Sequence, residues 1–194
     1  MSSAPRREWP TMTVEDFLAW DGDGHQGKLE LVDGEVRAMS PASATHGLIQ
    51  AALAILIGQH LKRGGTRCRI FTEPAVSVRV RANSNVRVPD LGVTCAAVAA
   101  NDQLLPDPVL LIEVLSPGNS DDTWDNVWAY CTIPTVREIV VVHSTRIRAE
   151  LLRRDGQGNW PENPEMIEMG GMLKLDGIGF EAALAEVYAD TYLA

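Results

Sequence analysis

The strongest constraint in this sequence is a pair of acidic residues, each inside a short apolar run. Asp90 ends a run that begins at Val88, and Glu113 lies in the middle of the run Leu111–Leu115. Apolar runs of this length are typical of buried strands, and an ionised carboxylate is costly to bury without a partner. We therefore predict that two neighbouring strands bring both acids to one cation.

A third acid, Glu30, lies in a strand-turn-strand pattern whose turn is Asp33-Gly34, a strong hairpin signal. Carboxylate oxygens are the ligands that Mg²⁺ prefers, and one or two of them are usually enough. A bound metal lowers the pKa of its water and offsets charge that develops on a phosphate. We predict that the three acids hold Mg²⁺ or Mn²⁺ for phosphodiester hydrolysis. The alternative for each acid is an ion pair with an arginine or an exposed position on a strand.

Length and composition indicate one globular domain. The chain has 194 residues, of which 45% are hydrophobic and 22% charged, and we predict a disordered lead over 1–12 followed by a single domain over 13–194. The net charge of −9 argues against a protein that coats nucleic acid by bulk attraction. The segment from Lys62 to Arg87 differs, because it contains seven basic residues and one acid.

Cysteine usage and hydropathy indicate the compartment. Cys68, Cys95 and Cys131 are odd in number and far apart, which favours reduced, buried thiols in a cytoplasmic protein. The longest apolar segment, Leu48 to Ile57, is too short to span a bilayer. We therefore predict no membrane partner.

The hydrophobic periodicity predicts a mixed α/β (α+β) fold. Helices are predicted over 14–20, 45–62, 122–130 and 181–188. Strands are predicted over 28–32, 35–39, 67–71, 75–80, 86–95, 109–115, 138–142 and 146–151, followed by a further hairpin. This order fits a central mixed β-sheet flanked by helices, with an N-terminal hairpin and a C-terminal strand extension.

The order of the acidic motifs resembles one protein family. The motif ELVDGEV at Glu30 is followed by MSP and His46, then by PDL at Asp90, and then by IEVLSP at Glu113. This order is similar to the Uma-type endonucleases of the PD-(D/E)XK restriction-endonuclease-like superfamily, over about residues 13–152. The resemblance implies a restriction-endonuclease-like fold and metal-dependent cleavage of DNA, with the three acids as catalytic residues and metal ligands.

The chain departs from this family at the catalytic lysine. The superfamily position two residues beyond the second acid is Leu115, and the Uma-type position, four residues before Tyr130, is Asn126. An amide cannot supply the charge of an ammonium group to a phosphate. Lys28 lies two residues before Glu30, and side chains two apart on a strand share a face. We therefore name Asn126 and Lys28 as candidate catalytic positions, the alternative for Lys28 being a hairpin-edge lysine in water.

Five further residues are candidates for binding the substrate. His46 and Gln50 share one helix face near an N-terminus that can accept phosphate. Arg79, Arg81 and Arg87 flank one turn and are predicted to contact the nucleic-acid backbone. A helix-capping role for the first two and solvated hairpin arginines for the rest are the alternatives.

Three functions are compatible with this pattern. The first is a metal-dependent DNA endonuclease in which Asn126 replaces the usual lysine. The second is a catalytically impaired nuclease-fold module for nucleic-acid binding or assembly. The third is a small-molecule binding domain with an apolar pocket between hairpin and sheet. A homodimer is predicted, formed through the helix with Trp124 and Trp128 or through the strand around Ile147 and Leu151.

Overall fold

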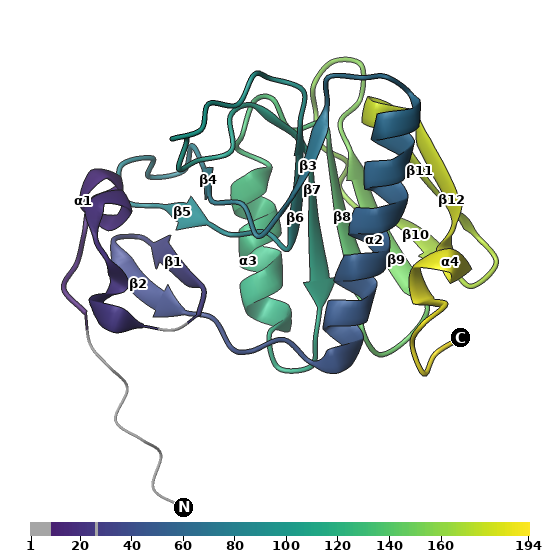
Figure 1. Cartoon of the computed structure of the whole chain (residues 1–194), viewed down its shortest axis with the longest axis horizontal. Helices are drawn as coiled ribbons and strands as arrows, with labels where there is room; N and C mark the ends of the chain where they lie inside the picture. Colours follow the sequence, from purple (N-terminus) through teal and green to yellow (C-terminus); the bar gives the residue numbers. More distant parts are fainter. Residues whose placement is uncertain (1–8, 26) are drawn as a thin grey trace, which may run out of the picture.

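The computed structural model describes residues 9–25 and 27–194, and its centre is a six-stranded mixed sheet (Figure 1). The strand order is β10-β9-β8-β7-β6-β3, in which β7 and β8 are parallel and the other neighbours antiparallel. The bounds are Arg69–Thr72 (β3), Leu91–Thr94 (β6), Pro108–Leu115 (β7), Glu138–His143 (β8), Arg148–Arg153 (β9) and Glu165–Glu168 (β10).

The sheet is covered by helices on both faces. Ile112 and Val114 of β7 pack in one core with helix α2 (Ala44–Arg63), whereas Leu111 packs in a second core with helix α3 (Ser120–Tyr130). A strand that is buried on both faces needs apolar residues at nearly every position. This explains why β7 is an almost continuous apolar run and why Glu113 within it needs a partner.

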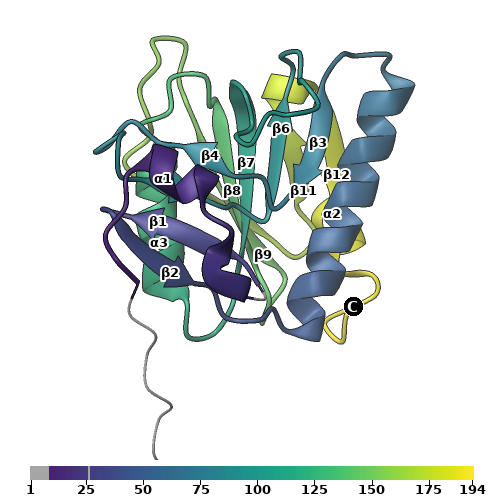
Figure 2. The same ribbon diagram turned by 60° about the vertical axis from the view of Figure 1, so that its left-hand side comes forward.

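The N-terminal hairpin belongs to a second sheet, which lies beside the first (Figure 2). Its order is β2-β1-β5-β4, and α1 and a short 3₁₀ turn precede it. The predicted turn is present, because Asp33 and Gly34 both have positive φ, 54° and 87°. The bounds are Val14–Ala19 (α1), Gly22–Gly24 (3₁₀), Leu29–Val32 (β1), Glu35–Ala38 (β2), Val76–Ser77 (β4) and Val86–Arg87 (β5).

The strand predicted over 86–95 is two strands in different sheets. The chain leaves the hairpin sheet after Arg87 and joins the central sheet at Leu91. Pro89 lies between them and has no N–H to donate to a strand ladder. Asp90 is therefore located where the chain crosses from one sheet to the other.

The C-terminal segment forms a strand pair and a short helix on the α2 side of the sheet. The helix predicted over 181–188 begins as a strand, because its first residues pair with β11. Their side chains alternate between buried and exposed, which suits a two-residue period. The bounds are Met172–Leu175 (β11), Asp176–Ile178 (3₁₀), Phe180–Ala183 (β12) and Leu184–Tyr188 (α4).

The lead predicted over 1–12 lies largely outside the described residues. Of its described part, Met12 donates its backbone N–H to the carbonyl of Gly34 at 2.8 Å. Trp9 packs edge-on against Trp20, with ring centroids 5.9 Å apart. Residues 9–12 thus pack against the hairpin and α1.

The prediction of three reduced cysteines is wrong for two of them. Cys68 and Cys95 form a disulfide where β3 and β6 lie side by side. The antiparallel ladder, continued by one residue beyond each strand, places these two positions opposite each other. Cys131 is free, and burial raises the pKa of its thiol to about 11.

The packing around β6 yields a first prediction, on Gly92. A Cβ atom there would lie 2.8 Å from Leu105 Cδ2 and 2.9 Å from Pro74 Cγ, closer than carbon atoms approach. We expect Gly92→Ala to lower the free energy of unfolding by about 1–3 kcal/mol. Gly156→Ala, where a Cβ meets nothing within 4 Å, should change it by less than about 0.5 kcal/mol. Urea denaturation measures both, and equal effects would contradict the assignment of close packing.

Candidate active site

Three acidic residues form one row: Glu73 directly follows β3, Asp90 directly precedes β6, and Glu113 lies within β7. Continuing the antiparallel ladders of these strands by one residue places Glu73, Asp90 and Glu113 opposite one another. The backbone N–H of Glu73 donates to the carbonyl of Asp90 at 2.9 Å, as this pairing requires. Directly opposite residues have Cβ atoms about 5 Å apart. The structure thus brings Asp90 and Glu113 together, as their positions in the sequence predict.

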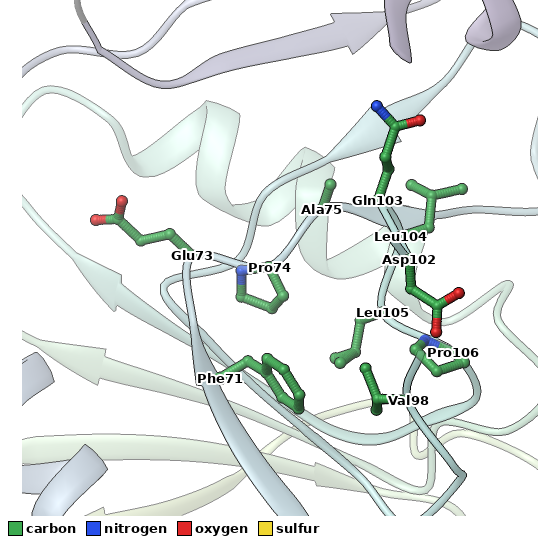
Figure 3. Close-up of a pocket in the computed structure, with 10 residues that line it drawn as sticks. All are labelled: Phe71, Glu73, Pro74, Ala75, Val98, Asp102, Gln103, Leu104, Leu105 and Pro106. Carbon is green, nitrogen blue, oxygen red and sulfur yellow. The ribbon is translucent and has the colours of Figure 1, made fainter. Parts of the chain in front are cut away.

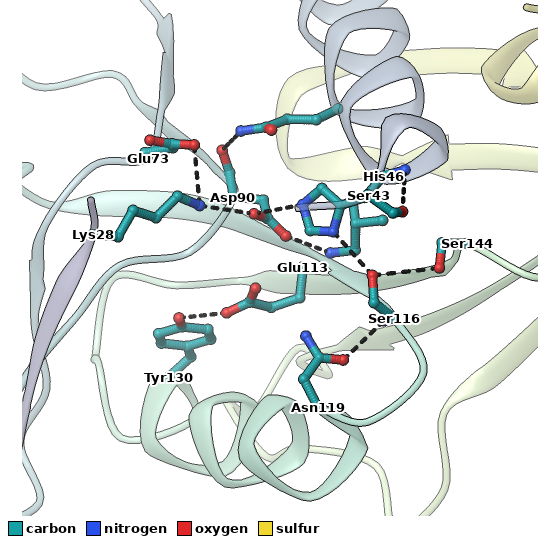
Figure 4. Close-up of polar contacts among 12 residues, drawn as sticks. Lys28, Ser43, His46, Glu73, Asp90, Glu113, Ser116, Asn119, Tyr130 and Ser144 are labelled. Carbon is teal, nitrogen blue, oxygen red and sulfur yellow. Dashed lines mark hydrogen bonds and ion pairs between the residues drawn. The ribbon is translucent and has the colours of Figure 1, made fainter. Parts of the chain in front are cut away.

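Asp90 is buried, and both of its carboxylate oxygens accept hydrogen bonds (Figure 4). Lys28 Nζ and His46 Nε2 lie 3.1 and 3.0 Å from Oδ1, and the backbone N–H of Val114 donates to Oδ2 at 2.7 Å. Burial alone would raise the pKa of Asp90, but the hydrogen bond and charge of His46 and the charge of Lys28 outweigh it and lower this pKa. Asp90 is therefore an ionised group inside the fold.

Lys28 forms a bridge between two acids of the row. Its Nζ lies 3.1 Å from Glu73 Oε1 and 3.1 Å from Asp90 Oδ1, and 23% of its side chain is exposed. Burial would lower the pKa of Lys28, but the charge of Asp90 and the contact with Glu73 raise it. The ammonium group thus stays charged, and it lies at the carboxylates rather than in water.

Glu113 is the most deeply perturbed acid of the site. Its Oε1 accepts a hydrogen bond of 2.6 Å from the Tyr130 hydroxyl. Burial, and then the charge of Asp90, raise the pKa of Glu113 well above its usual value, against the hydrogen bond from Tyr130. Burial and the charge of Glu113 also raise the pKa of Tyr130, so that Tyr130 remains a donor.

Glu30 reaches the same region from the hairpin. Its Oε1 accepts hydrogen bonds from the backbone N–H of Val88 at 2.7 Å and from Asn126 Nδ2 at 3.2 Å. Burial raises the pKa of Glu30, although the bond from Val88 and the charge of Arg87 act against it. Asn126 and Tyr130 are one turn apart on α3, so each of these helix residues holds one carboxylate.

Helix α2 contributes His46 and Gln50 to the site. Ser43 caps the helix through its Oγ, which accepts the backbone N–H of His46 at 3.2 Å. The His46 ring lies between Asp90 and Ser116, with Nδ1 3.1 Å from Ser116 Oγ. Gln50 Nε2 donates to the backbone carbonyl of Asp90 at 2.9 Å. Both predicted substrate-binding residues therefore hold Asp90 in place, and a direct contact with phosphate remains a prediction.

The three predicted substrate-binding arginines differ in position. Arg79 and Arg81 are exposed, and Arg81 Nη1 lies 2.6 Å from Asp33 Oδ2. Arg87 is buried, and its Nη1 donates to the carbonyl of Leu31 at 2.7 Å. The charge of Arg87 acts on Glu30, whose pKa it lowers against the effect of burial. The structure therefore favours a structural role for Arg87 over the predicted contact with substrate.

The residues of the site fit a small, hard cation. Mg²⁺ needs only one or two carboxylates, with water in its other positions, and Asp90 and Glu113 are neighbours. Hydrogen bonds from the described residues reach only Oε1 of Glu113 and only Oε1 of Glu30, which leaves each Oε2 for another partner. Within residues 9–25 and 27–194, however, no three His, Cys, Asp or Glu side chains are arranged to hold a metal. A cation shared by all three predicted acids therefore remains a prediction.

A cavity of about 220 Å³ lies next to the acidic row but does not include Asp90 or Glu113 (Figure 3). The carboxylate of Glu73 points away from its apolar wall. The cavity is smaller than the roughly 300–1,000 Å³ of typical ligand sites. The lining residues are Phe71, Glu73, Pro74, Ala75, Val98, Asp102, Gln103, Leu104, Leu105 and Pro106.

Sequence reasoning did not assign roles to Glu73, Ser116 and Tyr130. Glu73 is the single acid of the basic segment, and this isolation is the signal that marks it. Ser116 follows the apolar run of β7, where a hydroxyl can reach the end of a neighbouring helix. Tyr130 is fully buried, and a buried tyrosine hydroxyl usually has a hydrogen-bond partner.

Comparisons with known proteins identify the family of the chain and agree with its fold. Residues 14–185 match a sequence profile of the Uma2 family, described as "Putative restriction endonuclease". The protein slr1290 of Synechocystis sp., which is named as uncharacterized, is 26% identical over 193 residues and covers 97% of both chains. A crystal structure of a "putative nuclease belonging to DUF820" from Anabaena variabilis superposes with a TM-score of 0.74 at 16% identity. That alignment covers 92% of this chain and 98% of the other. The predicted fold, a mixed sheet flanked by helices, is confirmed.

The perturbed acid Glu113 yields a prediction on stability and pH. Because the pKa of Glu113 is raised in the folded protein, the fold keeps a proton that the unfolded chain releases near the usual glutamate pKa. This contribution to stability is therefore lost as the pH rises toward the raised pKa. The side chain introduced by Glu113→Gln cannot ionise. We therefore expect the free energy of unfolding of the metal-free variant, measured relative to wild type, to be higher at pH 8 than at pH 5 by on the order of 1 kcal/mol.

Urea denaturation in EDTA at both pH values measures this difference. Glu162→Gln at an exposed position is the matched control, and it should change the free energy of unfolding by the same amount at the two pH values. If the stability advantage of Glu113→Gln over wild type does not grow between pH 5 and pH 8, the raised pKa of Glu113 is contradicted.

Proposed function

Because this chain belongs to the Uma2 family of putative restriction endonucleases, we propose that it is a divalent-metal-dependent DNA endonuclease. The observation that supports this proposal best is the adjacency of Asp90 and Glu113 on paired strands, with Lys28 at the same carboxylate. Acidic ligands beside a cationic side chain are the groups that phosphodiester hydrolysis requires.

In this proposal Asp90 and Glu113 hold the cation, Mg²⁺ or Mn²⁺, and Glu30 adds negative charge. The cation supplies an activated water and offsets charge on the phosphate. His46 and Val114 fix the orientation of Asp90, and Tyr130 fixes that of Glu113. Such outer contacts orient metal-binding side chains.

We assign the role of the missing helix lysine to Lys28. The family position holds Asn126, whose amide contacts Glu30 and has no charge to offer. Lys28 Nζ lies 3.1 Å from Asp90 and is partly exposed. A charged, partly exposed ammonium group at the edge of the site is suited to stabilise a phosphate.

The second candidate is a nuclease-fold module that binds nucleic acid or assembles without cleaving it. It is favoured by one observation, the uncharged Asn126 at the family lysine position. In this case the carboxylates remain and Lys28 serves only to neutralise them. Cleavage assays decide between the two functions.

DNA is the proposed substrate, but only part of the basic segment from Lys62 to Arg87 lies near the carboxylates. Lys62 follows His46 by 16 residues on α2, which is roughly 24 Å along a helix. Arg79 and Arg81 are exposed, and we propose them as contacts to the DNA backbone. Their role is positioning, since phosphate contacts carry no sequence information.

A homodimer completes the proposal, whereas the predicted cytoplasmic location loses the support of reduced thiols, because Cys68 and Cys95 form a disulfide. Trp128 is 52% exposed on α3, whereas Ala149 and Leu151 are in the core, so α3 is the proposed contact. No helix in the described part of the chain is long and apolar enough to cross a membrane.

We expect light scattering to give twice the monomer mass for wild type and the monomer mass for Trp128→Glu. A monomeric wild type at high concentration would exclude the dimer.

The endonuclease proposal predicts that the wild type nicks supercoiled plasmid with Mn²⁺ or Mg²⁺ and not with EDTA. Asp90→Asn and Lys28→Ala should each lower the rate by about 10² or more, because each removes a charge from the reacting centre. Lys174→Ala, an exposed lysine on β11, is the control for loss of a positive charge and should cleave as wild type does.

Asn126→Lys separates the two candidate functions. If the wild type is inert and Asn126→Lys cleaves, the helix lysine is needed and Lys28 does not replace it. If both are inert although Mn²⁺ is bound to each, the endonuclease is refuted and the binding module remains.

A further inference from the structure

Three donors of different mobility hold the carboxylate of Asp90. The backbone N–H of Val114 belongs to a central strand, and the ring of His46 is buried and also bound to Ser116. Neither can leave without moving the core. Lys28 reaches Asp90 from the hairpin, through a flexible four-carbon stem that is 23% exposed.

Lys28 also occupies the electrostatic position that a cation would take. Its ammonium group lies 3.1 Å from an oxygen of Asp90 and 3.1 Å from an oxygen of Glu73, the first two acids of the row. The charge of Lys28 also reaches Glu30 and Glu113. The side chain therefore neutralises part of the same charge that would attract a divalent ion.

We propose that Lys28 is a built-in counter-ion of this site, and that a divalent cation binds by displacing its ammonium group from Asp90. This inference rests on the proposed function, because it concerns the cation of the same site. The displaced side chain keeps its charge and its attachment to the hairpin. It is then free to turn toward a bound phosphate, so that cation binding places Lys28 where the substrate needs it.

A counter-ion role and a purely structural role of Lys28 predict different changes in cation affinity when Lys28 is replaced. Removing a counter-ion frees the carboxylates and strengthens cation binding. Removing a lysine that only supports the fold leaves cation binding unchanged or weakens it. If Lys28 also acts on the phosphate, its loss lowers cleavage while cation affinity rises, and these opposite changes are specific to the proposed role.

The test is direct titration of the metal-free full chain with Mn²⁺, without DNA, followed by electron paramagnetic resonance of free Mn²⁺. We expect Lys28→Met, which keeps the length of the side chain without its charge, to bind Mn²⁺ about tenfold more tightly than wild type. Lys28→Gln should do the same, and it provides the measurement if Lys28→Met does not fold. Lys28→Arg, which keeps the charge, and Lys174→Met, which removes a charge on β11, should bind as wild type does.

The possible outcomes separate this inference from the proposed function. Asp90→Asn should abolish binding in the wild-type and Lys28→Met backgrounds alike, which locates the ion. If Mn²⁺ binds at Asp90 but Lys28→Met and Lys28→Gln bind it no more tightly than wild type, the counter-ion is refuted and the metal-dependent function stands. If no variant binds Mn²⁺ at millimolar concentration, both are refuted.

Discussion

The buried carboxylate of Asp90 is the interaction on which the site depends. It accepts contacts from the hairpin through Lys28, from α2 through His46 and from β7 through Val114. These elements come from distant parts of the chain, and Asp90 itself lies where the chain crosses between the two sheets. A buried charge of this kind is tolerated only when several donors share it. Asp90 is therefore one side chain through which hairpin, helix and sheet are linked directly.

The ionised carboxylate of Asp90 disfavours ionisation of its neighbour Glu113. Asp90 has three donors, whereas Glu113 has the hydroxyl of Tyr130 and a negative neighbour, and its pKa is raised well above the usual value. Two adjacent carboxylates with unequal donors are a destabilising arrangement for a protein that only needs to fold. A bound cation would relieve the repulsion between the pair. The perturbation itself is therefore an argument that the site serves binding rather than stability.

The sequence predicted the fold more completely than the contacts within the site. The mixed sheet, the helices and the hairpin turn at Asp33 follow from local periodicity and turn chemistry. The break at Pro89 was missed because an apolar run of that length does not show that its two halves join different sheets. The burial of Arg87 and the partnership of Lys28 with Glu73 were missed for a related reason. They depend on which sheet edge meets the hairpin, and the spacing of residues along one strand does not specify this.

The family pattern expects a lysine at position 126, whereas this chain has Asn126 there and the ammonium group of Lys28 near Asp90. Asn126 is buried on α3 and bound to Glu30, so a lysine there would be held by a carboxylate within the packed core. Lys28 is at the edge of the hairpin, where a partly exposed side chain has alternative rotamers within reach. If Lys28 takes the role of the helix lysine, as proposed, a fixed cation is exchanged for one that can be displaced. An acidic protein with few lysines can in this way use one ammonium group both to neutralise the carboxylates and to meet a phosphate.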